Sequence, residues 1–259
     1  MSTFKPSYAG YYDALYRDKD YAGEAAFVRS RILKYSPETR SILDLGCGTA
    51  RHATEFVRLG WQVLAVDQSR NMVRQAKAGR DRLAARLRSR LRLGVGDVTR
   101  YRVNEKFDAA TSLFHVVNYQ TTNADLSGLF RSARKSLRPG GLFMFDFWYG
   151  PAVKAEPPAI RIKRVRQGSV DILRLAEPVH HSKRHCVEVN YTVLAIDRRS
   201  GRSEQIEETH VVRYLFLPEI KRLGTAAGFR MIESGQWLTR KPLTTHTWSG
   251  YAILRAVGE

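Results

Sequence analysis

The sequence predicts an α/β protein in which a parallel sheet flanked by helices is followed by an inserted antiparallel sheet. Between Arg40 and Phe147, short apolar runs alternate with amphipathic segments, which is the pattern of strands alternating with helices. After Gly150, successive strand-like runs are joined by short turns, and strands joined in this way are antiparallel. No apolar run approaches the roughly 20 residues that a membrane-spanning helix requires.

The parallel part begins with a buried strand over residues 41–45. A helix over residues 50–59 follows and ends before Gly60, a residue typical of helix C-terminal caps. The turn Pro139-Gly140-Gly141 introduces the fifth strand. The other predicted elements of this part are strands at 61–66, 91–95, 107–112 and 142–147, and a long basic helix at 69–88.

A segment rich in tyrosines and charges, residues 8–34, precedes the core and is predicted to be largely helical. It is either a lid over a pocket or an amphipathic surface helix. We divide the chain into a helical cap (1–39), a core (40–150), an insertion (151–217) and a C-terminal part (218–259). The last two parts contain predicted strands at 160–165, 169–175, 187–196 and 205–216, a helix at 218–228, and closing strands at 231–237 and 248–255.

The composition is that of a globular enzyme with an excess of positive charge. Of 259 residues, 43% are hydrophobic and 26% are charged, and the formal net charge is +18. Cys47 and Cys186 are too few for a disulfide framework or a cysteine zinc site. The first residues lack the apolar core of a secretory signal, so we expect a cytoplasmic protein.

Much of the positive charge lies between residues 70 and 102, where Asp81 and Asp97 alone oppose it. A basic field of this kind attracts polyanions such as nucleic acid. The simpler interpretation, which we favour, is a solvated helix face. The basic residues are Arg70, Arg74, Lys77, Arg80, Arg82, Arg86, Arg88, Arg90, Arg92, Arg100 and Arg102.

The glycine-rich turn Asp44-Leu45-Gly46-Cys47-Gly48-Thr49 joins the first strand to the first core helix. Such a turn lets a nucleotide-like ligand approach the backbone at the carboxyl ends of the strands. A dinucleotide fingerprint requires a third glycine three residues after Gly48, where Arg51 stands. A P-loop requires a Gly-Lys-Ser/Thr sequence that does not follow here. The sequence therefore excludes both of these nucleotide sites.

Two acids complete the predicted cofactor site. Asp67 closes the second strand, where it can accept two hydrogen bonds from a ribose diol. Asp97 follows the third strand, where it can accept a hydrogen bond from the amine of adenine. Gly46 and Gly48 leave room for an amino-acid-like tail. A ligand with a ribose, an adenine and a zwitterionic tail, but no pyrophosphate, is S-adenosylmethionine, which is the predicted cofactor.

These motifs resemble those of class I S-adenosylmethionine-dependent methyltransferases. Residues 42–49, Ala65-Val66-Asp67 and Gly96-Asp97-Val98 are similar to the first three family motifs, and residues 137–141 to the turn before the fifth strand. The resemblance implies a Rossmann-like seven-stranded sheet with a reversed final strand. The predicted cofactor-binding residues are Tyr21, Asp44, Gly46, Cys47, Gly48, Thr49, Asp67, Gln68, Met72, Asp97, Val98 and Phe114.

The segment after the fourth strand argues against two classes of acceptor. Methyltransferases of nucleic-acid base amines carry Asn/Asp-Pro-Pro-Tyr here, and residues 112–119 lack this motif. Catechol-type O-methyltransferases hold a metal through acids in this region, but no acid lies between Asp108 and Asp125. We therefore predict no metal.

The N-terminal segment resembles the opening of nucleotide-linked amino-sugar N-methyltransferases, through Tyr12-Asp13-Ala14-Leu15-Tyr16 and Lys19-Asp20-Tyr21-Ala22-x-Glu24. The resemblance implies that this segment caps the cofactor, with Tyr16 as a catalytic residue facing the acceptor and Tyr21 facing the cofactor tail. It also implies that the insertion shapes the acceptor pocket, and often a homodimer interface. The group often has Ser-Ser-Val-Gly-Tyr where residues 115–119 read His-Val-Val-Asn-Tyr.

His115 is the predicted general base, because it follows the strand that should end beneath the methyl group. The alternative is that His115 only packs or forms hydrogen bonds in its loop. His210 and Arg213 lie on opposite faces of one strand, and the sequence leaves open which face lines the pocket. The predicted substrate-binding residues are Tyr12, Tyr119, Trp148, Tyr149, His210 and Arg213.

Three hypotheses for the function follow. The first is methyl transfer to an amine (or hydroxyl) of a small anionic metabolite, with a nucleotide-linked amino sugar as the best guess. The second is an RNA-modifying methyltransferase that uses the basic surface. The third, a non-catalytic scaffold, is disfavoured because the cofactor motifs are intact. For the first hypothesis, residues able to contact a diphosphate are Arg161, Lys163, Arg164 and Arg166.

Overall fold

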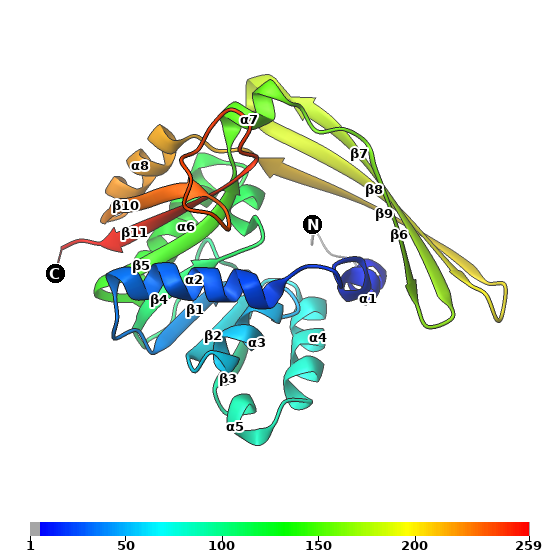
Figure 1. The fold of residues 1–259 in the computed structure, drawn as a ribbon, viewed down its shortest axis with the longest axis horizontal. Coiled ribbons are helices and arrows are strands. Elements are labelled where there is room, and N and C mark those ends of the chain that lie inside the picture. The colour runs from blue at the N-terminus through cyan, green and yellow to red at the C-terminus, as the bar shows by residue number, and fades with distance from the viewer. Residues whose placement is uncertain (1–5, 259) are drawn as a thin grey trace.

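The computed structural model describes residues 6–258, which form two sheets (Figure 1). The strands of the main sheet are β1 (Ser41–Leu45), β2 (Gln62–Asp67), β3 (Leu91–Val95), β4 (Phe107–Ser112), β5 (Leu137–Trp148), β10 (Phe229–Gln236) and β11 (Ser249–Ala256). They lie in the order β10-β11-β5-β4-β1-β2-β3. Residues 1–5 of the predicted N-terminal cap lie outside the described part of the chain.

The predicted Rossmann-like sheet with one reversed strand is confirmed. β1 pairs in parallel with β2 and β4, and the outer pairs β2–β3 and β4–β5 are also parallel. β11 runs antiparallel to both of its neighbours, β5 and β10. β11, the last strand in the chain, therefore lies between β10 and β5, which run parallel to each other.

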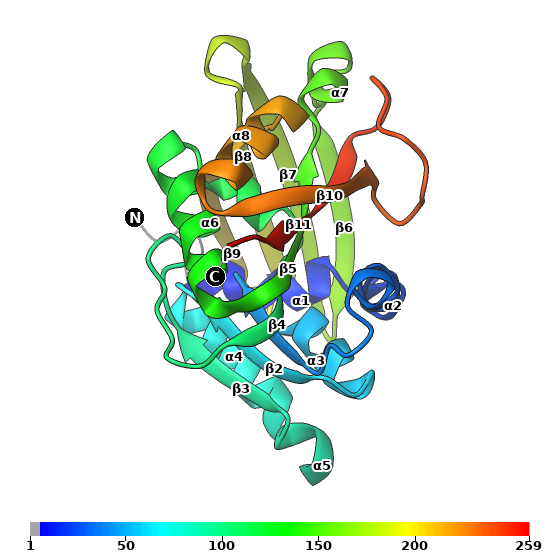
Figure 2. The ribbon, with the colours of Figure 1, turned by 90° about the vertical axis from the view of Figure 1, so that its left-hand side faces the viewer.

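Helices cover both faces of the main sheet, which explains why its central strands are apolar at nearly every position. They are α2 (Tyr21–Tyr35), α3 (Arg51–Arg58), α4 (Arg70–Asp81), α6 (Asn123–Ser136) and α8 (Leu217–Ala226). On one face, Ile32 of α2 and Phe56 of α3 pack with Ile42 of β1. On the other face, Phe130 of α6 packs with Leu43 of β1. Figure 2 shows α2 and α6 on opposite sides of the sheet.

The second sheet is antiparallel and projects away from the core (Figure 1). Its strands are β6 (Arg161–Gln167), β7 (Val170–His181), β8 (Cys186–Asp197) and β9 (Ser203–Arg213), and α7 (Gly150–Ala155) joins β5 to β6. β7 runs past the predicted end at residue 175. The last residues of β7 pair with β8 only, because the pairing of β6 with β7 ends at Ala176. Pro178 thus lies on an open edge, where a missing N–H is tolerated.

Two predicted helices are each divided. The helix expected at 69–88 ends at Asp81 and resumes as α5 (Ala85–Arg88). Leu83 and Leu87 turn inward to pack against the core, and this burial outweighs helix continuity. The segment predicted at 8–34 forms α1 (Pro6–Leu15) and α2, because Asp20 caps the start of α2 through the N–H of Gly23 at 2.8 Å.

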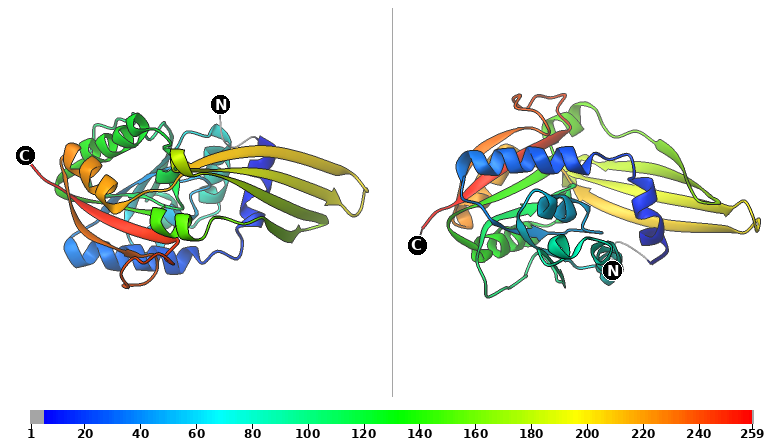
Figure 3. Two further views of the ribbon diagram at one scale, coloured as in Figure 1. Left: turned by 90° about the horizontal axis from the view of Figure 1, so that it is seen from above. Right: turned by 60° about the horizontal axis from the view of Figure 1, so that its bottom comes forward.

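α1 packs on the second sheet (Figure 3). Ala14 and Leu15 are buried in a cluster with Ile172 of β7, Val193 of β8 and Ile206 of β9. The N-terminal segment therefore reaches from the main sheet, through α2, to the inserted sheet. In the part of the chain that the structure describes, no helix is long and apolar enough to cross a membrane.

Candidate active site

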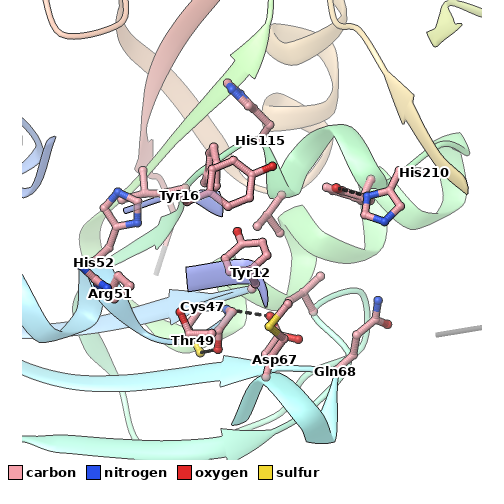
Figure 4. A pocket seen from close by; sticks show the side chains of 18 of the residues that line it. Tyr12, Tyr16, Cys47, Thr49, Arg51, His52, Asp67, Gln68, His115 and His210 are labelled. Carbon is pink, nitrogen blue, oxygen red and sulfur yellow. Dashed lines mark hydrogen bonds between the residues drawn. The ribbon is translucent and has the colours of Figure 1, made fainter. Parts of the chain in front are cut away.

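A cavity of about 280 Å³ opens at the carboxyl ends of the central strands, where the strand order reverses between β1 and β4. Ligands of open α/β sheets bind at this point. Arg51 and His52 lie at one end of the cavity and His210 at the other (Figure 4). The predicted residues on its wall are Tyr12, Tyr16, Tyr21, Asp44, Gly46, Cys47, Gly48, Thr49, Asp67, Gln68, Met72, Val98, Phe114, His115, Tyr119, Trp148 and His210.

The glycine turn is shaped by its backbone. Gly46 and Gly48 have φ angles of 82° and 54°, in the left-handed region that favours glycine. A Cβ on Gly46 would overlap the side chain of Val116. The N–H groups of Gly46 and Cys47 both donate to the carbonyl of Val66, at 2.8 and 2.9 Å. The turn is therefore fixed against β2 and keeps its backbone open to the cavity.

Two buried carboxylates face this cavity. Asp44 accepts a hydrogen bond from the Thr111 hydroxyl at 2.8 Å, and burial raises the pKa of Asp44 to about 6. Asp67 accepts from the backbone N–H of Gly48 at 2.9 Å and of Ser69 at 2.8 Å. Burial also raises the pKa of Asp67, and these two hydrogen bonds offset part of the effect. Ribose hydroxyls and an ammonium group would satisfy these acids, so the site fits S-adenosylmethionine.

Arg51 is a wall residue that the sequence analysis missed. Its guanidinium lies 4.9 Å from the ring centroid of Tyr21. Next to it, His52 Nε2 lies 2.7 Å from Glu24 Oε2, and both side chains are buried. A guanidinium here matches the carboxylate of an amino-acid tail. The sequence feature that could have identified Arg51 is its position at the start of α3, three residues after Gly48.

Asp97, the predicted adenine partner, does not lie on the cavity wall. Its Oδ1 accepts from the N–H and the hydroxyl of Thr99, at 2.9 and 2.8 Å, and its Oδ2 accepts from Arg100 Nε at 2.8 Å. Burial alone would raise the pKa of Asp97, but these hydrogen bonds lower it overall. The carboxylate caps the turn after β3.

Tyr149 and Arg213, two predicted substrate residues, also lie off the wall. Tyr149 packs against the main core, with its ring centroid 6.4 Å from that of Phe147. Arg213 forms an ion pair with Glu219 and donates to the carbonyl of Thr121 at 3.3 Å. Arg213 occupies the face of β9 opposite to His210, which answers the question that the sequence left open.

α1 covers one side of the cavity. Thr49 in the glycine turn donates a hydrogen bond to Asp13 Oδ1 at 2.8 Å, so α1 is tied to the cofactor turn. Tyr12 and Tyr16 line the wall, with ring centroids 4.8 Å apart. Tyr16 also contacts Phe114 edge-on, at 5.0 Å. The hydroxyls of Tyr12 in α1 and of Tyr16 directly after it thus lie between the cofactor turn and the second sheet.

His115 lies on the wall three residues after the end of β4, with a φ of 64° that is strained for a non-glycine residue. Its Nδ1 lies 2.8 Å from Asp146 Oδ2, and its backbone N–H donates to the same carboxylate at 3.1 Å. Burial would raise the pKa of Asp146, but the contacts with His115 lower it overall. Asp146 is therefore an anion that fixes the imidazole.

The second sheet completes the cavity. Tyr191 of β8 and His210 of β9 reach the wall, and the Tyr119 hydroxyl of η1 (Val116–Tyr119) lies 2.9 Å from His210 Nδ1. Tyr191 was missed by the sequence analysis. The sequence pattern that could have identified Tyr191 is the alternation of Val189, Tyr191 and Val193, which places all three on the inward face of β8.

Comparisons with known proteins give the same answer as the geometry. Residues 42–141 match the family model described as a methyltransferase domain. Residues 42–141 therefore form a methyltransferase domain, and the whole chain has the class I methyltransferase fold. Its fold is shared by a sugar N-methyltransferase from Streptoalloteichus sp ATCC 53650, with a TM-score of 0.80 and 22% identity over 95% of this chain and 93% of that one. The predicted cofactor of this class, S-adenosylmethionine, is confirmed with the fold.

Other relatives of this methyltransferase have named substrates. A dTDP-3-amino-3,4,6-trideoxy-alpha-D-glucopyranose N,N-dimethyltransferase from Streptomyces venezuelae is 28% identical over 88% of this chain and 92% of the relative. An amino pentose methyltransferase from Micromonospora echinaspora has a TM-score of 0.73 and 23% identity, and the match covers 99% of each chain. The similarity therefore extends beyond the core into the cap and the insertion.

Proposed function

We propose that this methyltransferase transfers a methyl group from S-adenosylmethionine to the amine of a nucleotide-linked amino sugar. One observation carries the proposal: the cavity lined by the cofactor turn is also lined by Tyr191 and His210 of the second sheet. A single cavity of this kind brings an acceptor held by the insertion up to the methyl donor. The substrates named for the relatives, dTDP-linked amino sugars, support the same class of acceptor.

The cofactor end of the cavity has groups for each part of the donor. Asp67 would bind the ribose hydroxyls, and Arg51 would bind the carboxylate of the amino-acid tail. When bound, S-adenosylmethionine supplies a methyl group on a positively charged sulfur. The protein's part is alignment, and holding a nucleophile near attack geometry lowers a barrier by about 7–11 kcal/mol in favourable cases.

Arg174 of β7 is our candidate for the diphosphate of the acceptor. Its Nη1 donates to the Tyr16 hydroxyl at 2.9 Å, and its guanidinium lies 5.3 Å from the ring centroid of Tyr191. It is thus positioned beside the acceptor end of the cavity. Two of the β6 residues suggested by the sequence have other partners: Lys163 pairs with Asp18, and Arg166 pairs with Asp171.

His115 is the proposed general base. The acceptor amine must lose a proton once its nitrogen has bonded to the methyl carbon. The contact between His115 Nδ1 and Asp146 would stabilise the protonated imidazole. Proton transfer would then use Nε2, on the other side of the ring.

The RNA-modifying alternative is less favoured. None of the basic residues between 70 and 102 lies on the cavity wall. Several are engaged elsewhere, as Arg92 is with Glu105 and Arg100 with Asp97. We interpret this surface as a solvated face. A cytoplasmic location and a homodimer remain predictions.

Thermal shifts test the acceptor class. The protein would be saturated with S-adenosylhomocysteine and then mixed with dTDP-, UDP- and GDP-linked sugars, plain nucleotides or short RNAs. A ligand of the native state raises the melting temperature in proportion to the logarithm of its excess over Kd. We expect a shift with amino sugars linked to dTDP. A shift with RNA alone, fading as salt rises, would reject the proposal.

A further inference from the structure

A chain of three hydrogen-bonded side chains runs from the interior of the second sheet to the acceptor end of the cavity. Glu208 Oε2 lies 2.8 Å from His210 Nε2, and His210 Nδ1 lies 2.9 Å from the Tyr119 hydroxyl. Glu208 and His210 are only 6% and 3% exposed. Tyr119 and His210 both line the cavity. The proposed role of His115 makes no use of these three residues.

The donor and acceptor groups of these three side chains fix the direction of the hydrogen bonds between them. A carboxylate can only accept hydrogen bonds, so His210 must carry a proton on Nε2 to bond with Glu208. The lone pair on Nδ1 is then the acceptor for the hydroxyl proton of Tyr119. A phenol oxygen can also accept hydrogen bonds, and Tyr119 lines the cavity where a donor on the acceptor would lie. Burial raises the pKa of Tyr119 well above its usual range, so the phenol keeps its proton.

We propose that Tyr119, His210 and Glu208 form a proton relay for the acceptor nitrogen, an inference that rests on the proposed function. An amine that arrives as an ammonium ion must lose one proton before its nitrogen can attack the methyl group, and this proton is distinct from the one that His115 accepts after the carbon–nitrogen bond has formed. The ammonium proton moves to the Tyr119 oxygen while the Tyr119 hydroxyl proton moves to His210 Nδ1. The resulting imidazolium is paired with the Glu208 carboxylate until it releases a proton to water.

The groups around His210 favour the protonated form of its imidazole. Its ring contacts the Tyr191 ring at 4.9 Å, and the guanidinium of Arg174 lies beyond, 5.3 Å from the Tyr191 centroid. Glu208 touches the imidazole directly, so its attraction for the imidazolium outweighs the repulsion from Arg174. Among the residues that the structure describes, the charged and titratable groups around His210 include Glu208 on β9, Tyr191 on β8, Arg174 on β7, Tyr119 on η1 and Tyr16 directly after α1.

Variants of Tyr119 and Glu208 test the relay in the intact enzyme with a dTDP-linked amino sugar. Tyr119→Phe removes the group that accepts the proton, and we expect kcat to fall about 10- to 100-fold. Glu208→Gln preserves shape but removes the charge that favours protonated His210. We expect kcat to fall about 10-fold and the acidic limb of its pH profile to move to lower pH, with partial rescue in Glu208→Asp. If Glu208 only supported packing, its substitution would not shift the acidic limb of the pH profile.

Glu207→Gln is the matched control, because Glu207 is an exposed neighbour on the opposite face of β9, where it accepts a hydrogen bond from Gln205. Its kcat and pH profile should match those of the unmodified enzyme. Unchanged kcat in Tyr119→Phe, or an unmoved acidic limb in Glu208→Gln, would overturn the relay.

A second measurement needs no acceptor. Nitrogen-15 spectra of the histidines, with His210 assigned by its loss in His210→Gln, report which ring nitrogen carries the proton. The relay requires the Nε2–H form, and the Nδ1–H form would overturn it. If the unmodified enzyme methylates no amino sugar, the proposed function fails, and the spectra still decide whether the hydrogen-bonded chain has the direction that the relay requires.

Discussion

The two ends of the cavity are built in different ways. The cofactor end is made largely by one continuous segment, from Asp44 to His52, with Asp67 added from the next strand. The acceptor end combines side chains from four elements that are distant in sequence: α1, η1, β8 and β9. Backbone geometry and buried carboxylates shape the first end, whereas aromatic hydroxyls and a histidine shape the second.

This difference separates the chemistry that is common to a class from the chemistry that selects a substrate. A short turn with two left-handed glycines suits the same cofactor whatever the acceptor is. The acceptor end depends on how α1 and the second sheet pack together, through residues such as Leu15 and Ile172. Substitutions at the first end should therefore reduce cofactor binding, and substitutions at the second should leave it intact.

The largest expected effect is at the cofactor end. Gly46→Ala places a Cβ against Val116 at a φ of 82°, where side chains are strained by about 1–3 kcal/mol. We expect the affinity for S-adenosylhomocysteine, measured by calorimetry, to fall about 100-fold. Gly79→Ala is the control, because a Cβ at Gly79 in α4 would meet nothing within 4 Å. Normal affinity in Gly46→Ala would show that the turn does not hold the cofactor.

Between the two ends, His115→Ala should separate chemistry from binding. We expect turnover to fall about 100-fold, within the usual range for loss of a general base. The affinity for S-adenosylhomocysteine should change little, because His115 contacts Asp146 and not the glycine turn. Steady-state kinetics beside a binding titration check both points. Unchanged turnover would remove His115 from the mechanism.

At the acceptor end, Arg174→Met should raise KM for the nucleotide sugar about 10-fold, the effect expected when one charge-assisted contact to a phosphate is lost. Cofactor affinity should stay the same. Arg202→Met, at an exposed position before β9, is the matched control. An equal rise in KM in both variants would mean that general surface charge, and not Arg174, attracts the diphosphate.

The smallest effect concerns the attachment of α2 to the main sheet. Glu233 of β10 accepts hydrogen bonds from Arg31 at 2.8 Å and Tyr35 at 2.7 Å. Burial would raise the pKa of Glu233, but hydrogen bonds from Arg31, Tyr251, Tyr35 and Lys34 lower it from 4.5 to about 2. Because the folded pKa is the lower one, the stabilisation is present above about pH 4.5 and is lost as pH falls toward 2.

We therefore expect the melting temperature to fall more steeply between pH 6 and pH 3 in the unmodified protein than in Glu233→Gln. After allowance for solvent screening, the difference is about 1 kcal/mol, or about 2–4 °C. Glu38→Gln is the control, because the side chain of Glu38 is 91% exposed. Parallel pH curves for Glu233→Gln and the unmodified protein would mean that the network adds no stability.

The sequence predicted the cofactor end better than the acceptor end, for a physical reason. The residues from Asp44 to Thr49 are adjacent, so their spacing alone places them together on the wall. Tyr191 and Arg174 reach the acceptor end only through strand register and the packing of α1, which no local pattern specifies. Asp97 shows what motif spacing does not predict. It lies at the expected position after β3, but its carboxylate accepts hydrogen bonds from Thr99 and Arg100 and does not line the cavity.

The central claim is that one cavity joins a methyl donor to an amino-sugar acceptor. The most direct test is to incubate the protein with S-adenosylmethionine and a set of dTDP-linked sugars that differ in whether they carry an amine or a hydroxyl. Mass spectrometry would then detect the methylated product. We predict methyl addition to the nitrogen of an amino sugar. Methylation of hydroxyl sugars alone, or of RNA with no reaction on any amino sugar, would contradict this account.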